Sequence, residues 1–78
     1  MLKDLIEHIA KALVDYPEEV KVNVVESETR MIFELNVAKE DMGRVIGKGG
    51  RIAEAMRILL AGASAAEGTK RATLEIVE

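Results

Sequence analysis

The segment Gly43-Arg-Val-Ile-Gly-Lys-Gly-Gly-Arg-Ile52 holds the most informative pattern in this chain of 78 residues. At its centre, a Gly-x-x-Gly loop from Gly47 to Gly50 separates two stretches that are expected to be helical. Because glycine has no Cβ, the backbone of such a loop can lie very close to another chain. Apolar residues come directly before the loop, and basic residues surround it. The pattern indicates a site where a sugar-phosphate backbone is clamped beside an apolar groove.

Outward from the loop, hydrophobic periodicity predicts the elements on either side. A first amphipathic helix ends before Pro17, since proline disfavours helix at the residue that precedes it. Alternating apolar residues then predict two strands joined by a polar turn. Next come a short helix at about 39–46, a longer helix that begins at about 51 and is capped by Gly68, and a last strand at 69–77.

The same periodicity predicts which side chains form the core. In the first helix, the apolar stripe comprises Leu2, Leu5, Ile6, Ile9 and Leu13. In the longest helix, it comprises Ile52, Met56, Leu59, Leu60 and Ala63. In the strands, the inward-facing residues include Phe33, Leu35, Leu74 and Ile76, whereas Val25 and Ile32 face the opposite side.

The order of elements is α-β-β-α-α-β, within a single domain that spans residues 1–78. The second and third strands are joined by a helical crossover, so they are expected to be parallel. The sequence therefore predicts an α+β fold with a three-stranded mixed sheet and three helices packed on one face.

Composition excludes several classes of site. The chain has no cysteine, so it has neither a disulfide framework nor a thiolate metal site. A lone His8 makes a poor metal ligand, and neither a metal site nor a cofactor is expected. No Ser/His/Asp or Cys/His set is present, which argues against an enzyme. Without a signal peptide or a membrane span, a cytoplasmic protein is expected.

The charges are distributed unevenly along the chain. The net charge is −3, but residues 1–40 carry −4 and residues 41–71 carry +3. We expect the basic residues to gather around the glycine loop as an anion-binding patch, with Arg57 alone read as a solvated helix residue. The acidic remainder should discourage indiscriminate binding to duplexes, whose affinity comes mostly from phosphate neutralisation.

Two other phosphate-binding motifs do not fit. A Walker loop would need glycine at Met42 and a hydroxyl residue at Gly49. A dinucleotide-binding fingerprint that starts at Gly47 would need glycine at Ile52.

The segment Val45-Ile-Gly-Lys-Gly-Gly-Arg-Ile52, within this order of elements, resembles the bacterial type II KH domain. The size, the first helix, Tyr16-Pro-Glu-Glu-Val20 and Gly43-Arg-Val-Ile-Gly-Lys48 resemble the KhpA family of small bacterial KH proteins across the whole chain. One departure is Ala53, where KH domains commonly carry a large aliphatic residue.

The resemblance implies a non-catalytic protein of the RNA-chaperone or post-transcriptional regulator type, which binds single-stranded RNA. Its expected RNA-binding residues are Arg44, Val45, Ile46, Gly47, Lys48, Gly49, Gly50, Arg51 and Ile52. Ile46 and Ile52, with Val45 or Met56, are expected to form the apolar floor. The only two aromatic residues, Tyr16 and Phe33, are too few for a stacking platform.

The resemblance also implies homodimers and heterodimers with a KhpB-type KH protein. Val25 and Ile32 are apolar residues on the strand face opposite the helices, and their position is consistent with dimerisation. The competing hypothesis is an interaction module whose KH fold serves dimerisation rather than RNA binding. The basic glycine loop favours RNA, since a scaffold has no need of a bare and charged backbone turn.

Overall fold

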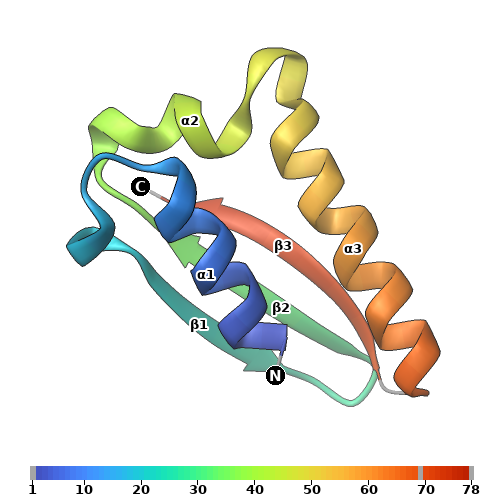
Figure 1. Ribbon diagram of the computed structural model, residues 1–78. Helices are drawn as coiled ribbons and strands as arrows, with labels where there is room; N and C mark the ends of the chain where they lie inside the picture. The colour runs from blue at the N-terminus through green and yellow to red at the C-terminus, as the bar shows by residue number, and fades with distance from the viewer. Residues whose placement is uncertain (1, 69, 78) are drawn as a thin grey trace.

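The computed structural model describes residues 2–68 and 70–77. The predicted order of elements is confirmed (Figure 1). The elements are α1 (Leu2–Leu13), β1 (Lys21–Glu26), β2 (Arg30–Asn36), α2 (Met42–Ile46), α3 (Arg51–Glu67) and β3 (Arg71–Val77). Short 3-10 turns lie at Pro17–Glu19, Lys39–Asp41 and Lys48–Gly50. Thr69, the expected start of the last strand, lies outside the described residues.

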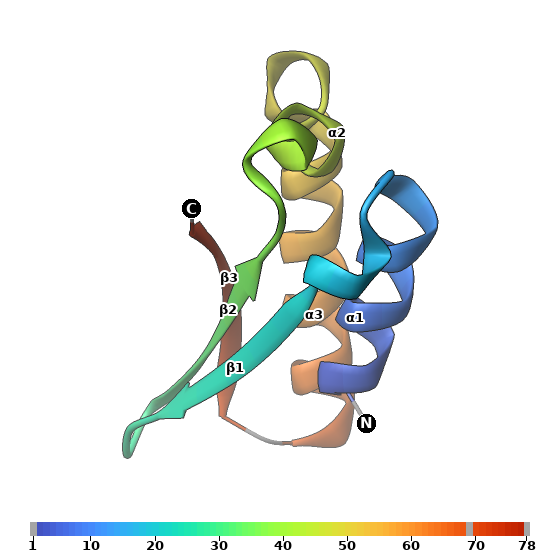
Figure 2. The same cartoon turned by 90° about the vertical axis from the view of Figure 1, so that its left-hand side faces the viewer.

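The sheet has the order β1-β2-β3, with β2 in the centre. β2 is antiparallel to β1 and parallel to β3, so the prediction of a mixed sheet is confirmed. The helices all lie on the same side of the sheet (Figure 2). The opposite face of the sheet is left uncovered by any helix in the described part of the chain.

The strands alternate between the covered and the open face, as predicted. Phe33 and Leu35 are buried under the helices, together with Leu74 of β3. Val25 and Ile32 pair directly across β1 and β2 on the open face. The predicted inward and outward faces of the strands are therefore confirmed.

The predicted helix stripes are rotated slightly from those observed. In α1, Ile6 and Ala10 are fully buried, whereas Leu5 is 40% exposed. In α3, Leu59 is 50% exposed. The buried face of α3 instead comprises Ala53, Met56, Leu60 and Ser64, which follow one another at spacings of three and four. The residues at the two ends of this face, Ala53 and Ser64, are small.

Asp41 connects the end of α1 to the start of α2. Its side chain is fully buried, and its two carboxylate oxygens accept hydrogen bonds from the backbone amides of Asp15 (3.1 Å) and Tyr16 (3.0 Å). The Arg44 guanidinium lies 3.6 Å from Asp41 Oδ1 and 3.0 Å from Asp15 Oδ2. This cluster fixes the position of α2, which leads directly into the glycine loop.

We predict that Asp41→Ala lowers the free energy of unfolding by roughly 2–4 kcal/mol, because it leaves two partly buried amides without an acceptor. Urea denaturation followed by circular dichroism measures the change. Glu40→Ala is the matched control, since it removes the same charge from an exposed neighbour. Equal stability of the two variants would contradict a structural role for the Asp41 cluster.

Candidate nucleic-acid interface

Gly47 ends α2 and begins the glycine loop. Its amide donates a hydrogen bond to the carbonyl of Gly43 (2.9 Å), and its φ is 78°. A Cβ at this position would lie 2.6 Å from Cγ1 of Ile52. The loop therefore packs directly on the first turn of α3, and a larger residue would push the two apart.

The rest of the loop turns tightly into α3. Gly49 and Gly50 have φ of 65° and 75°, and the Gly50 amide donates to the Gly47 carbonyl (3.0 Å). The helix begins at Arg51 and continues for 17 residues. The Arg51 amide likewise donates to the Lys48 carbonyl, so the amides of Gly50 and Arg51 already have partners in this turn. Amides of a first helical turn that lack such a partner favour anions.

The basic residues at the loop differ in their availability. Lys48 and Arg51 are exposed, and neither has a carboxylate partner within the described residues. Arg44, by contrast, is held by Asp15 and Asp41. Its charge is shared with these acids and contributes less to the loop than its sequence position indicates.

The apolar residues expected at the site divide between core and surface. Val45 is fully buried and Met56 is 2% exposed, so both fill the core and present no floor to a ligand. Ile46 is 36% exposed. Ile52 is partly buried beneath Gly47. Only Ile46 and Ile52 of this group reach the surface.

A groove extends from the loop along α3. Its first part is lined by Gly49, Gly50, Arg51, Glu54, Ala55, Arg57 and Ile58. Its second part lies between α3 and β3 and is lined by Glu54, Arg57, Ile58, Ala61, Arg71, Ala72 and Thr73. The two parts share three residues of α3, so they adjoin each other along the helix.

Sequence reasoning missed most of this lining. Ile58 is 63% exposed and supplies the apolar wall that the sequence placed elsewhere. The run Ile58-Leu59-Leu60 contained a signal, because three consecutive apolar residues exceed what one buried stripe of a helix requires. Arg57, expected to be only a solvated residue, lies in the groove and donates from Nε to the carbonyl of Leu74 (3.2 Å).

The basic residues do not all gather around the loop. Lys70 and Arg71 lie at the other end of α3, at the start of β3 (Figure 1). A helix of 17 residues is about 25 Å long, so sequence proximity to the loop does not bring them there. The positive charge instead follows the groove from Arg51 through Arg57 to Arg71.

Two other expectations concern metals and membranes. His8 is exposed, and the described residues contain no group of three His, Cys, Asp or Glu that could hold a metal ion. Across residues 2–68 and 70–77, no helix has both the length and the apolar character needed to cross a bilayer.

Comparison with known proteins agrees with this architecture. The family model described as "KhpA/KhpB, KH domain" matches residues 3–76. RNA-binding protein KhpA of Clostridium acetobutylicum is 53% identical over 76 residues, which cover 97% of this chain and all of the relative. The Borreliella burgdorferi protein of the same name is 52% identical, covering 96% and 90%. That of Listeria monocytogenes is 48% identical, covering 99% and 100%.

No solved structure is significantly similar to the chain. The family model nevertheless covers every element of the fold except the ends, and the relatives extend over their full or nearly full length. These relatives are named for binding and not for a reaction, and the family is not an enzyme family. The chain belongs to the KhpA/KhpB family of KH-domain proteins.

Proposed function

We propose that the chain binds single-stranded RNA without catalysis, through the glycine loop and the groove along α3. The observation that carries the proposal is that the exposed basic turn and the groove adjoin: Gly49, Gly50 and Arg51 line the same hollow as the apolar side chain of Ile58. The relatives in three bacteria are named RNA-binding proteins, which supports the same ligand.

The phosphates are bound at the loop. Gly47–Gly50 lets the sugar-phosphate backbone approach, and Lys48 with Arg51 adds charge. Arg44 acts mainly through its ion pairs, which hold α2 in place. KH domains clamp about four nucleotides in this way.

The bases lie in the groove. Ile58 supplies apolar contact within the groove, and Ile46 and Ile52 supply it beside the loop, outside the groove's lining. Arg57 and the outer edge of β3 offer hydrogen-bonding groups to the base edges, because β3 has a strand neighbour on one side only. Phe33 is 1% exposed, which leaves the sheet without an aromatic platform for stacking.

A single groove of this size makes few phosphate contacts, so we expect weak binding by one copy. Pairing of two grooves would raise the affinity through avidity. We propose a role of the RNA-chaperone or regulatory type, carried out by residues 1–78 as one unit. The partner is a second copy of this chain or a KhpB-type KH protein. The family model joins KhpA and KhpB in its description, which supports only the KhpB-type partner.

The alternative is that the KH fold serves only to pair with another protein. The net charge of −3 keeps this alternative open. The loop argues against this alternative. Its exposed Lys48 and Arg51 form no ion pair in the described part of the chain.

We predict that the double variant Lys48→Asp/Gly49→Asp loses RNA binding, because it places two negative charges against the phosphates. Fluorescence anisotropy of labelled single-stranded RNA pools measures the affinity, at low and at physiological salt. Asp is among the few residues that tolerate the positive φ of 65° at Gly49, and no atom would lie within 4 Å of its Cβ. The variant should therefore fold.

The matched control is Lys48→Asn/Gly49→Asn, which has the same shape without the added charges. It should retain most of the binding, with a loss that reflects Lys48 alone. If both variants bind RNA as the unchanged chain does, or if no protein binds, the protein-pairing role is the better account.

We further predict a dimer, with a mass by light scattering near twice the 8.5 kDa of the chain at tens of micromolar. Val25 is 48% exposed on the open sheet face and Leu59 is 50% exposed on α3, so each marks an apolar surface outside the groove. Val25→Glu or Leu59→Glu should shift the mass toward the monomer if its surface forms the interface. A monomeric mass for the unchanged chain would rule the dimer out at these concentrations.

A further inference from the structure

Two arginines lie side by side on the open face of the sheet, at the far end of the groove. Arg30 of β2 and Arg71 of β3 are direct partners in the parallel ladder. Thr73 lies two residues along β3 and therefore on the same face. These three residues line a hollow of about 150 Å³. Since one water occupies about 30 Å³, the hollow has room for a hydrated tetrahedral anion.

The pair is electrostatically unfavourable as it stands. Like charges directly opposite one another in a sheet are destabilising. Within the described residues, neither guanidinium is paired with a carboxylate. The nearest acidic residues on this face are Glu34 of β2 and Glu75 of β3. Each lies four residues further along its strand than the arginine, beyond Ile32 and Thr73. An anion between the two guanidinium groups would relieve the repulsion, and their planar donors suit a phosphate.

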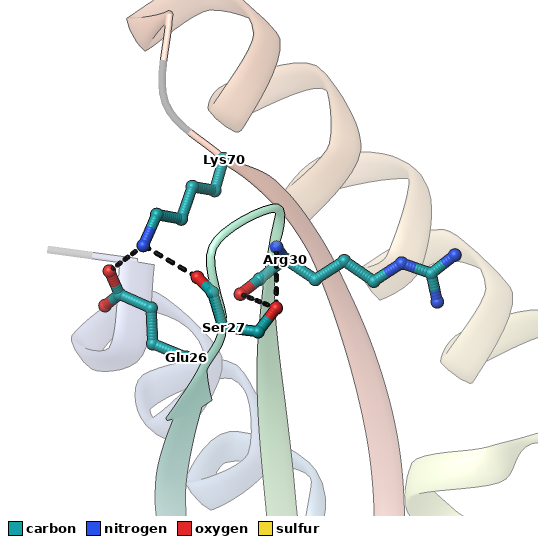
Figure 3. Close-up of polar contacts among 4 residues, drawn as sticks. All are labelled: Glu26, Ser27, Arg30 and Lys70. Atoms are coloured by element: carbon teal, nitrogen blue, oxygen red, sulfur yellow. Dashed lines mark hydrogen bonds and ion pairs between the residues drawn. The ribbon is translucent and has the colours of Figure 1, made fainter.

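The neighbouring turn holds Arg30 in place (Figure 3). The Arg30 amide donates to Ser27 Oγ (3.1 Å), and the Ser27 amide donates to the Arg30 carbonyl (2.9 Å). Lys70 Nζ contacts Glu26 Oε2 (2.6 Å) and donates to the Ser27 carbonyl (2.7 Å), which ties the turn to the start of β3. Figure 3 shows the Arg30 side chain extending from β2 across β3. Lys70 thus links the turn to β3, whereas the guanidinium groups of Arg30 and Arg71 form no ion pair within the described residues.

The hollow adjoins the groove. Arg71 and Thr73 line both the open-face hollow and the depression between α3 and β3. That depression shares Glu54, Arg57 and Ile58 with the hollow at the glycine loop. These three adjoining hollows, here called the track, lead from the loop, along α3 and past the edge of β3 to the open face.

We propose that Arg30, Arg71 and Thr73 form a second phosphate site, which holds the RNA backbone where it leaves the groove. The inference rests on the proposed function and extends it: strands longer than about four nucleotides bind at both ends of the track. The two guanidinium groups hold one phosphate between them, and the Thr73 hydroxyl donates to it. The loop then fixes one end of the strand and the arginine pair the other.

The test compares single-stranded RNAs of four and of ten nucleotides by fluorescence anisotropy over a range of salt concentrations. The variant is Arg30→Gln/Arg71→Gln. The control is Lys3→Gln/Lys21→Gln, which makes the same change in net charge at exposed positions outside the track. Removing two opposed like charges should leave the melting temperature at low salt equal or higher, which verifies folding.

We expect the arginine variant to bind the ten-nucleotide RNA about tenfold or more weakly than the unchanged chain, while it binds the four-nucleotide RNA as the control does. The slope of log affinity against log salt should fall by about 0.7 for the longer RNA, the value for one phosphate contact in a single strand.

Other outcomes separate the two proposals. If the arginine variant and the control bind the longer RNA equally, while the Lys48→Asp/Gly49→Asp variant does not bind it, the second site is overturned and the groove stands. If the unchanged chain binds neither RNA, the proposed function fails and the second site fails with it. If inorganic phosphate raises the melting temperature of the unchanged chain but not of the arginine variant, and RNA binding is equal, the pair holds a free anion and not RNA.

Discussion

β2 and β3 run parallel, and this pairing obliges the chain to travel back along the sheet before β3 can begin. The return path is α2, the glycine loop and α3, on the face that also carries α1 (Figure 2). The loop therefore lies at one end of the sheet, and α3 descends beside the outer edge of β3. A groove between a helix and a strand edge follows from this topology. Its far end is the start of β3, where Arg71 meets Arg30.

The position of the loop depends on two buried contacts near it. Asp41 accepts hydrogen bonds from the backbone at Asp15 and Tyr16, and thereby fixes the start of α2 against the end of α1. Ile52 packs under Gly47, where no Cβ can be accommodated. The loop can present its backbone to a ligand because both of its ends are held by such contacts. Arg44 belongs to this support, which explains why its charge is committed to Asp15 and Asp41.

Elements with a strong period could be predicted from the sequence, and so could the loop, because glycine, proline and alternating valines act locally. The buried faces of α1 and α3 were less predictable. Leu5 and Leu59 are exposed while Ala10 and Ala53 are buried, so hydrophobicity alone does not select the inner face of these helices. The position of the basic residues was also predicted incorrectly from the sequence. Lys70 and Arg71 belong to the same positively charged part of the sequence as the loop. In the structure, α3 is about 25 Å long and separates them from the loop.

Under the function proposed above, this separation explains how an acidic protein binds a polyanion. Net charge acts at long range and is screened over about 8 Å at physiological salt, so a ligand in the groove responds mainly to the charges that line it. Along the track these are Arg51, Arg57, Arg71 and Arg30, with Glu54 opposing them. The acids elsewhere repel duplexes and other extended polyanions that touch a broad surface. A single strand narrow enough to follow the track avoids most of that repulsion, so the same charge distribution that weakens binding in general favours one shape of ligand.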